Sequence, residues 1–305
     1  MMAEYDIIVL GGGPAGLAAT FYSLQAQLNV ALVAPSLGGK VSYPFALRGL
    51  PAVEAVWGAD LTQQFEAHVE AKLKAYFPQE AKQIQPRHGG GFQVMLDDTS
   101  LISAQTLIVC TGAHPQRLYV EGEMQYFGRG VSFSAISHAA FFRNRNVAVI
   151  GGERALPAVQ KLSALAARVY FVIARTDDIK RSHLAEQVLR NPKVFLFQEW
   201  EVQGISGDEF VTSLDLVGVN GETRSLPVEG VFVEFGLLPN IELVRDLVAL
   251  DEYGHIIVNQ RNETNVPGLF AAGDVTNVHA EQVPVAIGEG VKAALSAWSY
   301  LAMRR

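Results

Sequence analysis

Three glycines near the start of the chain have the spacing that binding of a pyrophosphate requires. Gly11, Gly13 and Gly16 form G-x-G-x-x-G between an apolar run at 5–10 and a segment with helical spacing at 14–27. Gly11 permits a tight turn, Gly13 lets a pyrophosphate reach the backbone, and Gly16 lets the helix lie close to the strand. The motif predicts a dinucleotide site, and the alternative is a glycine-rich turn without a ligand.

The elements that must position this motif occur twice along the chain. After the first glycines, an apolar run at 30–34 completes a strand–helix–strand unit, and a second such unit occupies 146–174 around Gly151 and Gly152. This duplication predicts an α/β fold with two Rossmann-like three-layer domains. The other expected elements are a helix at 58–76, a meander at 82–109, strands at 194–202, 210–219 and 228–234 with a hairpin turn at Asn220-Gly221, and a strand, turn and helix at 268–301.

The composition excludes several kinds of site and partner. The chain has 305 residues, a net charge of −7 and one cysteine, Cys110. A single cysteine forbids an intramolecular disulfide and a multi-cysteine metal site, and we predict no metal. The basic residues are interspersed among acidic ones and the net charge is negative, so the sequence shows no basic patch for binding nucleic acid. The first residues lack a basic signal-peptide start and a membrane span, so we expect a cytoplasmic protein.

Beyond the first glycines, the chain resembles the low-molecular-weight thioredoxin reductases over nearly its whole length. GGGPAG from Gly11 resembles their FAD pyrophosphate loop, LGGKV at 37–41 their GGQ segment, VCTGA at 109–113 their ATGA crossover, and AAGDV at 271–275 their AAGD. The resemblance implies that Asp274 accepts hydrogen bonds from the flavin ribityl chain. The implied FAD-binding residues are Gly11, Gly13, Pro14, Ala15, Gly16, Gly38, Gly39, Lys40, Thr111, Gly112, Gly273, Asp274, Gln282 and Val283.

The same resemblance implies a domain organisation and an assembly. Residues 1–114 and 241–305 correspond to a discontinuous FAD-binding domain, and residues 115–240 to an inserted pyridine-nucleotide-type domain. The chain is expected to cross between them near 114–122 and 236–241. FAD is the implied cofactor, and a homodimer is the implied assembly.

One departure from the family pattern concerns its redox-active C-A-T-C-D. The aligned residues are Ser134, Ala135, Ile136, Ser137 and His138. Serine cannot cycle through a disulfide, so dithiol chemistry is impossible here, and Cys110 lies in an expected buried strand as an inert core residue. We take Ser134, Ser137 and His138 as candidate catalytic residues. The alternative for His138 is a surface or hydrogen-bonded histidine.

A second departure concerns the second glycine loop. The family pattern G-G-G-x-S/T-A is replaced by Gly151, Gly152, Glu153, Arg154, Ala155 and Leu156. Glu153 opposes a pyrophosphate by its Cβ and its charge, and Leu156 crowds the contact between helix and strand. The family's H-R-R survives only as Arg175, with Lys180 and Arg181 as candidate substitutes, and a solvated basic turn explains these residues equally well. NADPH binding is therefore disfavoured.

A third departure lies at the flavin site, where Lys40 replaces the glutamine of GGQ.

Three functions remain open at this point. The first is a flavin oxidoreductase that exchanges electrons with a partner other than NADPH and a disulfide: a ferredoxin-like electron-carrier protein, or a second flavin or aromatic ligand in the inserted domain. The second is a NAD(P)H-dependent ferredoxin or flavin reductase, which also lacks the dithiol. The third is a flavoprotein kept for binding or sensing without turnover. We expect no dithiol-dependent reduction of thioredoxin, because a fold can be inherited without its chemistry.

Overall fold

A computed structural model describes residues 4–42, 45–53, 59–174 and 179–304 of the chain. The described residues form two compact units. The first unit contains residues 4–42, 59–114 and 238–304, and the second contains 45–53, 115–174 and 179–237. Both are α/β units with a Rossmann-like sheet, so the predicted fold class is confirmed. None of the described helices is long and apolar enough to cross a lipid bilayer.

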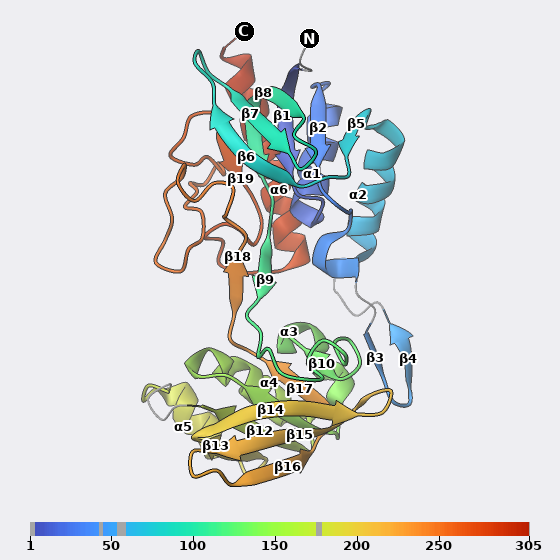
Figure 1. Ribbon diagram of the computed structural model, residues 1–305, viewed down its shortest axis with the longest axis vertical. Helices are drawn as coiled ribbons and strands as arrows, with labels where there is room; N and C mark the ends of the chain where they lie inside the picture. The colour runs from blue at the N-terminus through green and yellow to red at the C-terminus, as the bar shows by residue number, and fades with distance from the viewer. Residues whose placement is uncertain (1–3, 43–44, 54–58, 175–178, 305) are drawn as a thin grey trace. The chain divides into compact units, whose positions relative to one another are not determined.

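The first unit is built on a sheet of seven described strands in the order β5-β2-β1-β8-β7-β6, with β19 paired to β8 (Figure 1). Strands β2, β8 and β19 continue the parallel sheet from β1, whereas β7 and β6 are antiparallel. The elements are β1 (Glu4–Leu10), α1 (Pro14–Gln25), β2 (Val30–Val33), α2 (Ala59–Lys72), β5 (Ala75–Phe77), β6 (Ala81–Pro86), β7 (Phe92–Leu96), β8 (Leu101–Val109), β19 (Leu269–Ala271) and α6 (Val283–Ala302).

The core of this unit follows from the alternation of side chains along its strands. Ile7 and Val9 of β1 face helices α1 and α6, while Ile8 and Leu10 face the opposite layer. Because both faces are covered, the strand is a continuous apolar run, as parallel strands are. Helices α1 and α6 lie so close together that a Cβ on Gly290 would meet the carbonyl oxygen of Ala15 at 2.1 Å.

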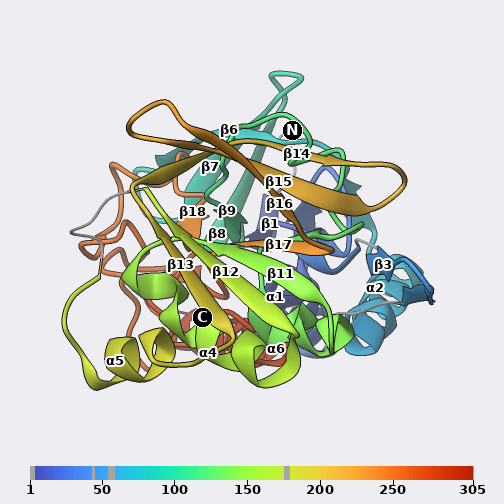
Figure 2. The same cartoon turned by 90° about the horizontal axis from the view of Figure 1, so that it is seen from below.

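The second unit has a parallel sheet of five described strands in the order β10-β17-β11-β12-β13. Figure 2 shows α4 and α5 on one face of this sheet and the antiparallel strands β14, β15 and β16 on the other. The elements are β3 (Phe45–Leu47), β4 (Leu50–Val53), β10 (Val131–Ser132), α3 (Ala135–His138), β11 (Asn146–Ile150), α4 (Leu156–Leu165), β12 (Arg168–Ile173), α5 (His183–Leu189), β13 (Val194–Gln198), β14 (Trp200–Gly207), β15 (Val211–Gly218), β16 (Thr223–Pro227) and β17 (Gly230–Val233).

Two short strands stand at the places where the chain passes from one unit to the other. They are β9 (Ala113–Pro115) and β18 (Leu237–Pro239), and they pair with each other. Strand β9 overlaps the segment expected to cross at 114–122, and β18 lies within the one expected at 236–241. Near them, Glu123 is fully buried and accepts hydrogen bonds from the backbone N–H groups of Leu118 and Tyr119, at 2.7 and 2.9 Å. A buried carboxylate is satisfied there by backbone donors.

Several elements differ from the sequence-based expectation. The helix expected at 58–76 ends at Lys72, because the next residues form β5, a three-residue edge strand paired with β2. The strand expected at 194–202 is two strands, separated at Glu199, whose φ is +61°. Strand β16 was not expected, although the hairpin turn at Asn220-Gly221 that leads to it was.

The hairpin β3–β4 also differs from the expected division of the chain. Residues 1–114 were assigned to one domain, yet this hairpin belongs to the second unit. Phe45 and Leu47 are buried in the core cluster that contains α4, β11 and β12. The backbone N–H of Ala46 donates to the carbonyl oxygen of Gly128 at 2.7 Å, and Arg145 Nη2 donates to that of Arg48, also at 2.7 Å. Burial of two apolar side chains explains the placement.

Candidate functional site

The first glycine loop joins β1 to α1, and two of its glycines exclude any side chain. Gly11 has φ +111°, and a Cβ there would lie 2.2 Å from the carbonyl oxygen of Cys110. At Gly16 a Cβ would lie 1.8 Å from the carbonyl oxygen of Gly11. Gly13 differs, because its nearest neighbour would be the Cα of Gly39 at 3.9 Å. Gly13 therefore borders space that a ligand can enter.

The start of helix α1 offers donors to that space. The helix begins at Pro14, its N-cap is Gly13, which has no side chain to cap it, and its first turn contains no acidic residue. The first N–H groups of a helix have no intrahelical acceptor, and the aligned peptide dipoles make this end positive. An uncapped helix N-terminus of this kind fits a pyrophosphate. The residues present therefore fit the phosphates of FAD.

Two further predicted segments meet this loop. The N–H of Gly38 donates to the carbonyl oxygen of Gly12 at 2.9 Å, and a Cβ on Gly39 would lie 2.8 Å from the Cα of Gly13. A Cβ on Gly273 would lie 3.0 Å from the Cβ of Ala15. The fold thus brings the 38–40 and 273–274 segments to the first glycine loop, as a shared site requires.

Lys40 and Asp274 form an ion pair across these two segments. Lys40 Nζ lies 2.6 Å from Asp274 Oδ2. The lysine side chain is 44% exposed and the aspartate side chain 15% exposed. The two residues that the sequence assigned to FAD binding are therefore direct partners of each other.

The remaining predicted FAD residues occupy the end of β8 and the start of α6. Thr111 Oγ1 donates to the carbonyl oxygen of Asn240 at 2.7 Å, and Asn240 Nδ2 donates to that of Thr111 at 2.8 Å. Gly112 has φ +67°, and no described atom lies within 4 Å of a Cβ built on it. Gln282 is the N-cap of α6, and Val283 is its first residue. Asn240, which holds the crossover at Thr111, was not singled out by any sequence motif.

The second glycine loop also joins a strand to a helix, but its residues differ from those of the first loop. A Cβ on Gly151 would lie 2.8 Å from the carbonyl oxygen of Glu234. In the first loop, a Cβ on Gly11 would likewise meet the carbonyl oxygen of Cys110. Residues Glu153–Ala155 form a 3₁₀ turn, and α4 begins only at Leu156. Leu156 is 1% exposed and belongs to the core. A 3₁₀ turn that begins with Glu153 thus stands where the first unit has an open glycine and an uncapped helix start.

The second loop carries one basic residue, Arg154, and the sequence offers Lys180 and Arg181 as further candidates for holding a phosphate. A Cβ on Gly236 would lie 2.6 Å from Arg154 Nη1, so the guanidinium lies against this backbone. Lys180 and Arg181 are exposed. Arg175 lies outside the described residues.

Ser134 and Ser137 are hydrogen-bonded to each other. Ser134 is the N-cap of α3: its Oγ accepts from the N–H of Ser137 at 3.3 Å and donates to Ser137 Oγ at 3.1 Å. The two hydroxyls therefore stand at neighbouring positions, as the alignment with the family's cysteines implied. In this geometry the hydroxyl of Ser134 caps the helix that contains Ser137.

His138 is held in a half-buried, neutral state. Its Nδ1 lies 2.8 Å from Ser132 Oγ, and its ring stacks on Phe45 with the centroids 4.2 Å apart and the planes at 6°. Burial lowers the pKa of His138 to about 4, because the charged imidazolium is poorly solvated. This geometry favours the hydrogen-bonded alternative for His138, and its catalytic role stays a prediction.

Glu234 is an ionisable residue that the sequence motifs did not single out. It follows β17, and its Oε1 accepts a hydrogen bond from the N–H of Ala135 at 2.7 Å. Burial raises the pKa of Glu234 to about 7. The signal in the sequence was a lone acid within the apolar run VFVEFG. Among the described contacts, Glu234 is the one acid that links the end of β17, beside the second loop, to the segment that contains Ser134 and Ser137.

Cys110 is not a redox group in this structure. It is 5% exposed within the core of the first unit, and burial raises the pKa of its thiol well above the usual range. A thiol must ionise to act as a nucleophile, so Cys110 is inert. No group of three or more potential metal ligands occurs among the described residues.

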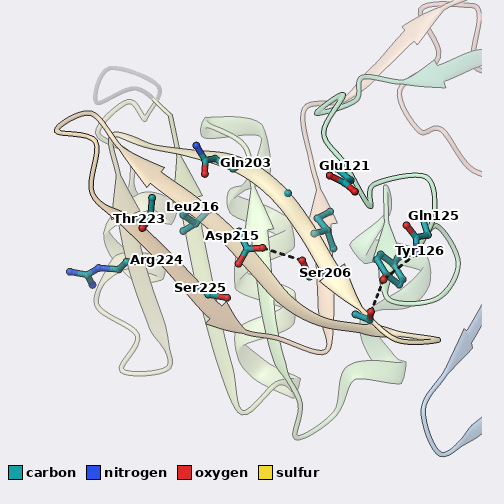
Figure 3. Close-up of a pocket in the computed structure, with 13 residues that line it drawn as sticks. Glu121, Gln125, Tyr126, Gln203, Ser206, Asp215, Leu216, Thr223, Arg224 and Ser225 are labelled. Atoms are coloured by element: carbon teal, nitrogen blue, oxygen red, sulfur yellow. Dashed lines mark hydrogen bonds between the residues drawn. The ribbon is translucent and has the colours of Figure 1, made fainter.

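The second unit also has a polar hollow of about 660 Å³ over β14, β15 and β16 (Figure 3). Its walls include Glu121, Gln125, Gln203, Thr223 and Ser225. Tyr126 Oη donates to the carbonyl oxygen of Gly207 at 2.8 Å, and Ser206 Oγ to Asp215 Oδ2 at 3.1 Å, as the figure shows. No residue of either glycine loop lines this hollow.

Two Rossmann-like units, one with a complete FAD-type loop, define a flavin-dependent oxidoreductase of thioredoxin reductase-like fold. The family model described as pyridine nucleotide-disulphide oxidoreductase matches residues 5–290, and the chain belongs to this family. The family implies FAD and a pyridine nucleotide as cofactors.

Curated relatives and solved structures agree with this assignment. An alkyl hydroperoxide reductase subunit of Pseudomonas aeruginosa is 34% identical over 303 residues, which cover 97% of this chain and 58% of that protein. The chain thus spans little more than half of this relative. Thioredoxin reductase from Streptococcus pyogenes is 29% identical with a TM-score of 0.88, covering 99% of this chain and 100% of that one. Thioredoxin reductase from Giardia duodenalis is 28% identical with a TM-score of 0.85 over the same shares.

Proposed function

We propose that this protein is an FAD-dependent oxidoreductase that exchanges electrons with a partner other than NADPH and a redox disulfide. The observation that carries the proposal is the contrast between the two glycine loops. Gly13 borders open space before an uncapped helix, whereas the carboxylate-bearing Glu153 starts a 3₁₀ turn before a buried Leu156. An anionic pyrophosphate fits the first arrangement and is repelled by the second.

The residues of the first unit have distinct roles in this proposal. The N–H groups at the start of α1 hold the pyrophosphate, and Gly13 lets it approach. Asp274 accepts hydrogen bonds from the ribityl chain, and Gln282 and Val283 place backbone groups at the edge of the ring. Bound FAD supplies the electron-transfer chemistry, while the protein positions and tunes it.

The missing disulfide supports a different route for the electrons. Ser134 and Ser137 carry no sulfur, Ser134 caps the helix turn that contains Ser137, and Cys110 is buried in the other unit. The partner we propose is a ferredoxin-like electron-carrier protein, or a second flavin or aromatic ligand in the second unit. The names of the relatives, reductases and a reductase subunit, support an electron-transferring role.

We propose a homodimer on the same resemblance, and a cytoplasmic location stays a prediction.

The decisive test is the absorption spectrum of the purified protein, with the ratio of flavin to protein, before and after anaerobic addition of NADPH. We expect a flavin spectrum, about one flavin per chain, and no bleaching at a catalytic rate. A ratio near two would identify a second flavin as the partner. Rapid bleaching by NADPH would overturn the proposal.

The family assignment favours a second candidate, a NAD(P)H-dependent ferredoxin or flavin reductase. For that enzyme the second loop must bind the nucleotide in spite of Glu153. Replacement of Glu153 by glycine should then change NADPH affinity little, whereas a large gain would show that the natural site is closed. A flavin that no physiological carrier reduces or oxidises would instead indicate a binding or sensing protein.

A further inference from the structure

We propose that Lys40 is a charge-compensating residue of the FAD site: by neutralising Asp274, it makes the bound flavin easier to reduce. The inference rests on the proposed function, since it requires FAD in the first unit. It concerns a residue in which this chain departs from the family pattern, where a glutamine occupies the position of Lys40.

The fold fixes both partners of this ion pair at the glycine loop. Lys40 lies in a 3₁₀ turn, Gly39–Ser42, whose preceding residue Gly38 is hydrogen-bonded to Gly12 at 2.9 Å. Asp274 follows Gly273, which has φ +79° and lies against Ala15 of α1. Lys40 Nζ and Asp274 Oδ2 lie 2.6 Å apart, and both residues belong to backbone segments that contact the first glycine loop.

The pair leaves acceptor capacity for the cofactor. A carboxylate has two oxygens and about four lone-pair positions. Lys40 contacts Oδ2, so Oδ1 stays available to accept from a ribityl hydroxyl. The lysine can thus neutralise Asp274 without displacing the hydrogen bond that the proposed function gives this residue.

The balance of charge then decides the effect on the flavin. At neutral pH a two-electron-reduced flavin carries more negative charge than the oxidised form, so a bare carboxylate nearby disfavours reduction. With a glutamine at position 40, Asp274 would have such a bare charge. With Lys40, the pair is neutral overall. Asp274 is 15% exposed and Lys40 44% exposed, so this partly buried pair is screened less than a pair on the open surface.

The test is the midpoint potential of the flavin in the full-length FAD-bound protein and in Lys40→Gln. We expect a negative shift that corresponds to about a tenfold fall in the preference for reduced over oxidised FAD, or about 30 mV for two electrons. Lys40→Arg should keep the natural potential, because it keeps the charge. In Lys40→Gln/Asp274→Asn the balance of charge is restored, so the potential should return toward the natural value.

Lys292 provides a matched control. It pairs with Glu289 at 2.9 Å, with side-chain exposures of 44% and 16%, and lies within α6 of the same unit. Lys292→Gln should leave the flavin potential unchanged, so an equal shift in both single variants would contradict the inference. It is also overturned if Lys40→Gln keeps the natural potential, or if this variant cannot hold FAD supplied in excess. A natural protein that binds no FAD would overturn the proposed function itself.

Discussion

The two glycine loops follow the same path from strand to helix, yet the residues at two positions make them different sites. In the first loop, Gly13 leaves open space and Gly16 lets α1 lie against the backbone of Gly11. In the second, Glu153 and Leu156 occupy the corresponding places, and the helix begins after a 3₁₀ turn. Topology provides the crevice, and the side chains decide whether an anionic dinucleotide can use it.

The residues that follow the neighbouring strands, β8 and β17, also differ between the two loops. After β8 the residue next to the glycine loop is Cys110, which is buried and uncharged, and after β17 it is Glu234. The first loop thus lies beside an uncharged residue, Cys110, whereas the second lies beside Glu234 and contains Glu153 and Arg154. Four substitutions test whether these residues account for the difference between the two loops.

The largest effect is expected for Gly16→Leu, which copies Leu156 into the first loop. Because a Cβ there would lie 1.8 Å from the carbonyl oxygen of Gly11, helix α1 must move away. We expect a loss of about 3 kcal/mol or more in the free energy of unfolding, together with loss of FAD. Denaturant unfolding and the flavin content measure both. A variant that keeps its flavin would show that helix contact is not required.

Gly13→Glu copies Glu153 and separates binding from folding. Its Cβ has room, so the unfolding free energy should change little, whereas its carboxylate would face the pyrophosphate. At an effective dielectric constant near 20 and a separation of about 5 Å, the repulsion is about 3 kcal/mol, or two orders of magnitude in FAD affinity. Titration of the flavin-free protein with FAD measures it, and Gly13→Ala is the control for size alone.

Glu234→Gln tests the charge at the second site through its pH dependence. Burial raises the folded-state pKa of Glu234 to about 7, above its ordinary value, so the folded protein binds this proton more tightly than the unfolded chain. Wild-type stability therefore falls as the pH rises from the ordinary value of a glutamate to about 7.

The glutamine variant avoids this loss because it is always neutral. We expect it to be more stable than the wild type by about 3 kcal/mol at pH 8 and nearly equal near pH 4. Thermal unfolding across this range measures the difference. Glu222→Gln, at an exposed position, is the control, and a gain of equal size there would contradict the assignment.

The smallest effect is expected for Glu153→Gly, which restores one feature of the first loop. Removal of the carboxylate should raise NADPH affinity by about tenfold, or about 1.4 kcal/mol, and no further, because Leu156 still displaces the helix start. Calorimetric titration with NADPH is the measurement. Unchanged affinity in this variant would favour the NAD(P)H-dependent candidate.

What could be predicted from the sequence were features with a local cause. The strand–glycine–helix units, the Asn220-Gly221 turn and the helix from Val283 each follow from a run, a spacing or a turn residue. Strand β5 could not be predicted, because three residues carry no period and its pairing with β2 depends on a distant segment. The placement of Glu234 likewise depends on Ala135, 99 residues away. The Lys40–Asp274 pair spans 234 residues, and no local pattern encodes it.

The hairpin β3–β4 has a consequence for dissecting this molecule. The second unit is made from two pieces of chain, because Phe45 and Leu47 complete its core. A fragment cut at the two crossovers would lose these side chains and uncover the ring of His138 that Phe45 stacks on. Recombinant expression of this unit on its own therefore calls for a redesigned gene, in which the codons for the hairpin are fused to those for 115–237.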